Sequence, residues 1–337
     1  MTETAEKRLS VIIPGYRTPC DVWRRCIDSI LPNLREDDEV ICIDDGSPEP
    51  SMVLDEMREK DSRISVLKLV ENRGQAVARN AGIDKARGKY ITFVDSDDAI
   101  CTGVYKEAIA ELERSAADIV VYGVKVIWRR EGLCKADAMD DGYVGEMTPK
   151  MLYQMKTAHL FNYQCNKIYS REFLDNAHIR FREGFNPGED EVLNLECVIA
   201  RAKWTILRRI GYIYYHGDGS SLSSYKPYND RSVRGIRDAW RKCREALHDD
   251  EGYLTGVGER TDSQIELSNW TNMWRWNTPY SIADRWRWLH KHPELGGVVL
   301  FAKTAAFFFA RHHLYFRPIR RWHLKKILPE IKEWKPE

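Results

Sequence analysis

The stretch YITFVDSDD, residues 90–98, is an apolar run that ends abruptly in three carboxylates. A short run of β-branched and aromatic residues bounded by polar ones is typical of a buried strand. Asp95 and Asp97 follow directly after it, one residue apart, so both can face a common point and hold a divalent cation through oxygen ligands. A solvated acidic turn has the same pattern, so this stretch alone leaves both interpretations open.

The preceding residues alternate between short apolar runs and helical stretches. The pattern predicts strands at 9–13, 40–43 and 64–69, and helices at 20–32, 53–58 and 73–87. Asn72 and Gln75 predict a capping box at the start of the third helix. Such alternation favours an α/β fold with a mostly parallel sheet and helices on both faces. In such sheets ligands bind beyond the carboxyl ends of the strands, where the polar clusters 44–47 and 95–98 both lie.

The composition is that of an ordinary soluble globular protein, with 43% hydrophobic and 31% charged residues in a chain of 337. The formal net charge of +1 favours no polyanionic partner, and no nucleic acid is expected. The eight cysteines form no CxxC pair, which argues against a zinc site or a redox dithiol. The first residues lack the apolar core of a signal peptide, so we expect a cytoplasmic location with reduced cysteines.

The composition changes near residue 228. Strand signals end there, and seven of the eleven tryptophans lie beyond residue 265. We therefore predict an α/β domain at 1–227 and a mostly helical region at 228–337. Within 298–326, an apolar stretch of thirteen residues precedes a run of basic side chains. It is too short to span a bilayer, which needs about 20 residues, so it either lies in a membrane surface or packs as a buried helix.

Four motifs resemble the inverting family 2 glycosyltransferases, which have the GT-A fold. They are VIIPGY at 11–16, IDDGS at 43–47, ENRGQAVARNAGI at 71–83 and FVDSDD at 93–98, in the family's order and spacing. Weaker similarity continues at 166–174, 188–190 and 214–223. The sequence departs from the family pattern at Gly15 and Arg17, where an apolar β-branched residue and an asparagine are usual. The resemblance implies a nucleotide-sugar-binding, mostly parallel sheet and transfer of a sugar from a nucleotide-diphosphate sugar, with a UDP-sugar as the expected donor.

The resemblance also implies a set of donor-binding residues. They are Pro14, Tyr16, Asp45, Asn72, Arg79, Asp95 and Ser96. Pro14 and Tyr16 would line the base pocket, and Asp45 would accept a hydrogen bond from the base imide. Several have a structural alternative: core packing for Tyr16, an Asx-turn for Asp45, a helix cap for Asn72, and an ion pair with the DSDD turn for Arg79.

The second half of the implied mechanism needs a cation and a base. Asp97 and His216 would hold Mn²⁺ or Mg²⁺, with Asp95 on the ribose or on a metal-bound water. Asp190 would be the general base, and Glu189 would orient the acceptor. Loop histidines are often only surface residues, and acidic residues are common in first helical turns for stability alone.

Two rival functions were weighed. A sugar-phosphate nucleotidylyltransferase would need a glycine-rich phosphate loop after the first strand, and the sequence has none there. A non-catalytic module that binds nucleotide sugars or membranes would tolerate loss of Asp97, Asp190 or His216, and all three are present. Lys167 could neutralise a phosphate or simply be solvated. We expect the acceptor to be a saccharide or lipid-linked saccharide in polysaccharide or glycoconjugate synthesis.

Overall fold

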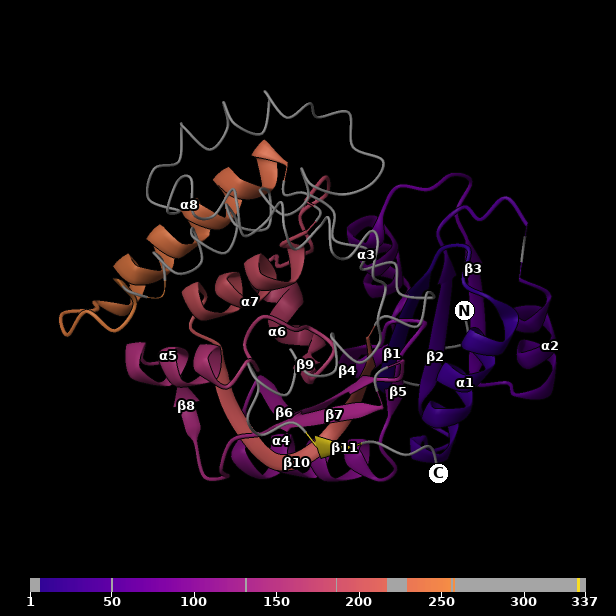
Figure 1. Ribbon diagram of the computed structural model, residues 1–337, viewed down its shortest axis with the longest axis horizontal. Helices are drawn as coiled ribbons and strands as arrows, with labels where there is room; N and C mark the ends of the chain where they lie inside the picture. The colour runs from indigo at the N-terminus through magenta and orange to yellow at the C-terminus, as the bar shows by residue number, and fades with distance from the viewer. Residues whose placement is uncertain are drawn as a thin grey trace.

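The computed structural model describes residues 7–49, 51–130, 132–185, 187–216, 229–255, 257 and 332–333. The strands are β1 (Lys7–Gly15), β2 (Glu39–Asp44), β3 (Ile64–Lys68), β4 (Gly88–Phe93), β5 (Ala99–Ile100), β6 (Ile119–Trp128), β7 (Leu133–Asp137), β8 (Val144–Glu146), β9 (Lys167–Ser170), β10 (Lys203–Tyr215) and β11 (Lys332–Glu333). The helices are α1 (Cys20–Ile30), α2 (Met52–Lys60), α3 (Gln75–Lys85), α4 (Val104–Ser115), α5 (Pro149–Thr157), α6 (Arg171–Asn176), α7 (Glu189–Ile199) and α8 (Asp230–Leu247), with a 3₁₀ turn at Leu31–Asn33. Figure 1 shows their arrangement.

A single mixed sheet joins these strands in the order β11-β7-β6-β9-β4-β1-β2-β3, with β5, β8 and β10 joined to it through β10. The strands β1 to β4 pair only in parallel with one another, as predicted from the alternation. Beyond them, β9 pairs antiparallel with both β4 and β6. The sheet is therefore more mixed than the sequence suggested. Antiparallel neighbours need no crossover helix, so these strands lack the strand–helix alternation from which the parallel strands were predicted.

The core forms because the apolar runs of the strands are buried on both faces, as expected of strands covered by helices. In β1, every residue from Leu9 to Gly15 is buried. The apolar side of α1 contributes Trp23, Cys26, Ile27 and Ile30 to the same cluster, as its spacing predicted. In Figure 1, α1 and α2 lie beside the edge formed by β2 and β3, and α4 packs on β6 and β10.

The chain after residue 228 is described only in part. Helix α8 packs against α7, and its residues Ile236, Trp240 and Cys243 belong to the same hydrophobic core as the sheet. Lys332–Glu333 pairs as a short strand with β7, where the sequence predicted helix to the end of the chain. The proposed boundary at 228 stays a prediction, and the segment 298–326 lies outside the described residues.

All eight cysteines are described, and none forms a disulfide. Among the helices that the structure describes, none combines the length and apolar character needed to cross a membrane.

Candidate active site

The loops after β1, β2 and β4 meet at one edge of the sheet. Gly15 is in register with Asp44, and the amide of Asp45 donates to the Gly15 carbonyl at 2.8 Å. The hydroxyl groups of Ser96 and Thr18 share a hydrogen bond of 2.8 Å, which ties the DSDD turn to the loop after β1. The two acidic turns therefore share the edge where the sequence placed a ligand site.

The predicted base pocket is built on the end of β1. Pro14 is buried opposite Ile43, while Tyr16 is only partly buried and has the Arg17 guanidinium 5.2 Å from its ring centre. A side chain at Gly15 would place its Cβ 2.3 Å from the Trp23 ring. The indole thus fills the space of the β-branched residue usual in the family, which explains this departure from its pattern.

The first acidic turn is held by neutral donors from the segment before α3. One Asp45 carboxylate oxygen accepts the Arg73 amide at 3.0 Å, and the other accepts the Gly74 amide at 2.8 Å and the Asn72 side-chain amide at 2.9 Å. Burial raises the pKa of Asp45, and the two backbone donors oppose that rise. The carboxylate is thereby fixed in direction.

The predicted capping box is wrong. Helix α3 begins at Gln75, its N-cap is Gly74, and no side chain caps it. The Asn72 side chain donates instead to Asp45, because a carboxylate is a stronger, charged acceptor. Gly46 allows this approach, since a Cβ there would lie 2.2 Å from the Glu71 backbone.

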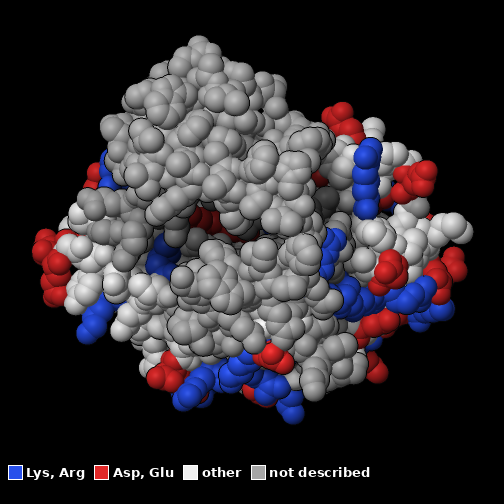
Figure 2. Space-filling model, viewed as in Figure 1, with Lys and Arg blue, Asp and Glu red and all other residues white. Residues whose placement is uncertain are grey.

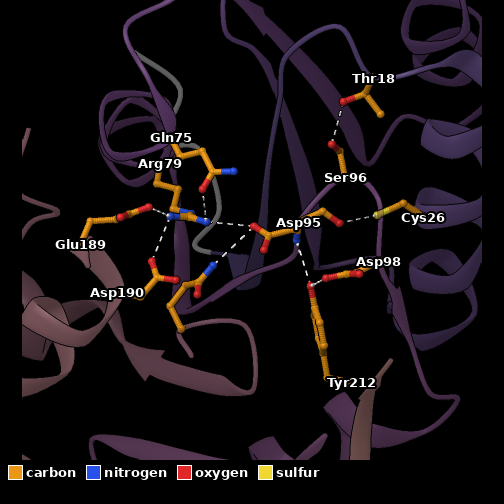
Figure 3. A network of polar contacts seen from close by, with 11 residues as sticks. Thr18, Cys26, Gln75, Arg79, Asp95, Ser96, Asp98, Glu189, Asp190 and Tyr212 are labelled. Atoms are coloured by element: carbon orange, nitrogen blue, oxygen red, sulfur yellow. Dashed lines mark hydrogen bonds and ion pairs between the residues drawn. The ribbon is translucent and has the colours of Figure 1, made fainter. Parts of the chain in front are cut away.

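The second acidic turn is anchored by Asp98, which the sequence analysis gave no role. Its fully buried carboxylate accepts the Tyr212 hydroxyl at 2.6 Å and the Tyr215 amide at 2.9 Å, while the Asp95 amide donates to the same hydroxyl (Figure 3). Burial raises the pKa of Asp98 well above its ordinary value, reinforced by the charges of Asp97 and Asp95. Its place directly before the apolar pair Ala99–Ile100 was the only sequence signal of burial.

The predicted cation ligands lie next to this anchor in the chain. Asp97 precedes Asp98, and His216 follows Tyr215, so each is the chain neighbour of a residue in the Asp98–Tyr215 hydrogen bond. The Asp97 carbonyl accepts from Arg25 at 2.5 Å. Among the described residues, no three His, Cys, Asp or Glu side chains form a group that could hold a metal. Any cation at Asp97 and His216 would therefore depend on ligands from the substrate and from water.

Arg79 lies at the centre of the site, between the DSDD turn and the start of α7 (Figure 3). Its guanidinium is 2.9 Å from Asp95, 3.0 Å from Asp190, 3.3 Å from Glu189 and 3.1 Å from the Gln75 side chain. The Arg79 side chain is 1% exposed, whereas Asp95 and Asp190 are 26% and 27% exposed. The ion pair with the DSDD turn, left open by the sequence, is present.

The predicted base stands at a helix start. Gly188 adopts a left-handed conformation (φ 111°), and α7 begins at Glu189 as predicted. Burial raises the pKa of Asp190 well above its ordinary value; Arg79 opposes this rise, and Glu189 adds to it. A carboxyl with a raised pKa is a stronger base once ionised. In Figure 2 acidic side chains are visible in the region where Figure 1 places α7.

Lys167 has a structural role. Its ammonium is fully buried and donates to the Leu160 carbonyl at 2.9 Å and the Asn166 side chain at 2.8 Å, which puts it out of reach of a phosphate. Burial lowers the pKa of Lys167 to about 7. The loop that it holds carries Gln164, whose amide lies 3.4 Å from Asp95.

Comparisons with known proteins agree with this geometry. Residues 10–177 match the family described as Glycosyl transferase family 2. The chain is 30% identical over 231 residues to the uncharacterized glycosyltransferase EpsJ of Bacillus subtilis, an alignment that covers 67% of this chain and 66% of EpsJ. It is 28% identical to the succinoglycan biosynthesis protein ExoO of Rhizobium meliloti, over 63% of this chain and 62% of ExoO. The chain thus spans slightly less than two thirds of either relative.

Among solved structures, the chain is similar to residues 1–349 of S. aureus TarS in complex with UDP-GlcNAc. The TM-score is 0.65 with 19% sequence identity, and the match covers 84% of this chain and 79% of the TarS chain. This likeness confirms the expected GT-A fold. The family match over residues 10–177 and the similarity to EpsJ show that the chain belongs to glycosyl transferase family 2.

Proposed function

We propose that the chain is an inverting glycosyltransferase that transfers a sugar from a UDP-sugar to a hydroxyl of a saccharide or lipid-linked saccharide. The observation that carries the proposal is that Arg79 bonds to both Asp95 and Asp190, which supports a base next to the DSDD turn. The names of two similar proteins, one solved with UDP-GlcNAc and one from succinoglycan biosynthesis, support the donor and acceptor classes.

The donor would lie along the edge formed by the loops after β1, β2 and β4. Tyr16, partly exposed at the end of β1, offers a ring for the base to pack against. The amides of Arg73 and Gly74 already fix the Asp45 side chain. A remaining lone pair can therefore accept a hydrogen bond from the base imide with little further loss of conformational entropy. Asp95 and Ser96 would face the ribose and diphosphate.

A divalent cation, Mn²⁺ or Mg²⁺, fits the same edge. Asp97 and His216 would hold it through an oxygen and a nitrogen ligand, and the hydrogen bond between their chain neighbours Asp98 and Tyr215 supports this pairing. When bound, such a cation neutralises the charge that develops on a departing diphosphate.

Asp190 would take the proton of the acceptor hydroxyl as its oxygen attacks the anomeric carbon. The new bond to the acceptor forms as the bond between the sugar and the diphosphate oxygen breaks, so the anomeric configuration inverts. Burial raises the pKa of Asp190, which makes its ionised carboxylate a stronger base. Glu189, beside it at the start of α7, would orient the acceptor.

The experiment is a panel of UDP-sugars incubated with the full chain, Mn²⁺ or Mg²⁺ and saccharide acceptors, with release of UDP as the signal. We expect release with at least one donor, its loss in excess chelator, and inversion of the anomeric centre by NMR. Retention of configuration, or full activity in chelator, would contradict the proposed mechanism. A nucleotidylyltransferase would instead release inorganic pyrophosphate from UTP and a sugar phosphate. Membrane contact through 298–326 and a cytoplasmic location stay predictions.

A further inference from the structure

Arg79 links the DSDD turn to the start of α7. It reaches from α3 to Asp95 of the DSDD turn on one side and to Asp190 at the start of α7 on the other. We infer that Arg79 is a positioning residue. It holds the base Asp190 at a fixed position relative to the DSDD turn and makes no contact with the donor. This inference rests on the proposed function, because it takes Asp190 as the base.

Four of the five N–H groups of Arg79 are used within the protein. Its Nη1 atom donates to Glu189 and Asp190, and its Nη2 atom donates to Gln75 and Asp95. A guanidinium has two hydrogens on each of these nitrogens, so none is left for a phosphate. The fifth N–H group, on Nε, is buried and has no hydrogen-bond partner within the described residues. The donor contact that the family resemblance implied for Arg79 would therefore fall to this one buried N–H group.

The position of the guanidinium is set by the fold. Its central carbon lies 5.2 Å from the centre of the Phe181 ring, which itself packs edge-on against Phe93 of β4. The Phe181 backbone is bound on both sides by the Asn80 side chain, at 2.8 and 2.9 Å. Asn80 follows Arg79 in α3, so one helix fixes both the guanidinium and the ring on which it rests.

The contact constrains Asp190 without covering it. Arg79 bonds to the Oδ1 atom of Asp190, which leaves Oδ2 outside this hydrogen bond on a side chain that is 27% exposed. A base misplaced by about 1 Å can cost about 100-fold in rate. A lysine would keep the positive charge, but a single ammonium cannot reproduce the planar fork that spans Asp95 and Asp190.

The test compares Arg79→Lys with a matched control, Arg8→Lys. Arg8 makes a comparable buried ion pair with Asp38 near the start of β1, away from the candidate site. Both variants lose an arginine fork inside the protein. With the best donor of the UDP-sugar panel, we expect Arg79→Lys to lower kcat by about 10- to 100-fold with little change in the donor KM. Arg8→Lys should lower the melting temperature and leave kcat unchanged.

A double-mutant cycle separates positioning of the base from general damage. If Arg79 acts through Asp190, Arg79→Lys should lower kcat by less than about twofold in an Asp190→Asn background. The same loss in both backgrounds, or wild-type kcat in Arg79→Lys alone, would overturn the inference. Wild-type kcat in Asp190→Asn alone would overturn the proposed function itself.

A milder variant serves if Arg79→Lys does not fold. Gln75→Met removes one acceptor of the Nη2 atom and leaves every charge in place. We expect kcat to fall by about three- to tenfold, since the lost hydrogen bond is made to a charged group and Asp95 still accepts from the same Nη2 atom. That loss should again vanish in the Asp190→Asn background. An unchanged kcat in Gln75→Met, or a loss that persists in that background, would overturn the inference.

Discussion

The two acidic turns at the edge of the sheet look alike in sequence and differ in how their carboxylates are held. Asp45, after β2, accepts only from neutral amides of residues 72–74. Asp95, after β4, faces the charged guanidinium of Arg79, and Asp98 faces hydrogen-bond donors from β10. Neutral amides fix a carboxylate without a counter-charge, whereas a shared guanidinium links one carboxylate electrostatically to others.

This difference separates two tasks. The first turn connects to the end of β1 and to the segment before α3. The second turn connects to α3, α7 and β10 at once, through Arg79 and Tyr212. Changes near the second turn should therefore alter turnover and pH-dependent stability, and changes in the first should alter donor affinity alone.

The largest effect is expected from Asp190→Asn. The amide keeps the shape of the side chain but removes its basicity, so turnover should fall by roughly 10²–10⁴-fold, the usual contribution of a general base. Calorimetric titration with UDP should show donor affinity near the wild-type value. Glu196→Gln, on the same helix and paired with Arg182, is the control and should leave turnover unchanged. Full turnover in Asp190→Asn would place the base elsewhere.

The next effect concerns the pH dependence of stability. The folded-state pKa of Asp98 is raised, so between about pH 4 and that higher value the folded protein binds more protons than the unfolded chain. Stability is lost as pH rises through this window, by up to about 1.4 kcal/mol per pH unit. The side chain of Asp98→Asn cannot titrate. The melting temperature of this variant minus that of the wild type should therefore increase as pH rises from 4 to 8.

A control of opposite sign is available for this measurement. The Lys68 ammonium lowers the pKa of the exposed Asp55, so Asp55→Asn should lose slightly on the wild type over the same range. A melting-temperature difference between Asp98→Asn and the wild type that stays constant with pH would show that Asp98 does not titrate in this window.

The smallest effects are expected at the first turn. Asp45→Asn leaves one oxygen for the amides of Arg73 and Gly74, which should weaken UDP binding by about tenfold, the equivalent of one hydrogen bond of about 1.4 kcal/mol. Asn72→Ala removes a donor and keeps the carboxylate, so a loss of about two- to threefold is expected. Turnover at saturating donor should stay within about twofold for both. A large loss of turnover would mean that the first turn takes part in the chemistry.

The sequence could predict the first four strands because each is a short apolar run, and those of β1, β2 and β4 end in a proline or an aspartate. The edge on which the two turns meet followed from that pattern. The strand β10 was harder to see, because its register with β6 shifts between Leu207 and Tyr212 and interrupts the alternation of its side chains. The strands β7 and β8 could not be predicted, because both are short and lie in a polar stretch of the sequence.

The contacts that organise the site could not be predicted in the same way. Arg79 meets Asp190 across 111 positions of sequence, and Tyr212 meets Asp98 across 114. Spacing patterns report local periodicity and carry no signal for pairs so distant. The burial of Lys167 was equally hidden, since its partners are mainly backbone carbonyls that any sequence supplies.

The central claim is that the second turn binds a nucleoside diphosphate together with a cation. The most direct measurement is calorimetric titration of the full chain with UDP, with Mn²⁺ or in excess chelator, for the wild type and Asp97→Ala. We predict that the wild type binds UDP only with the cation, and that Asp97→Ala gives the same weak binding in both conditions. Equal wild-type affinity with Mn²⁺ and in chelator would contradict the claim.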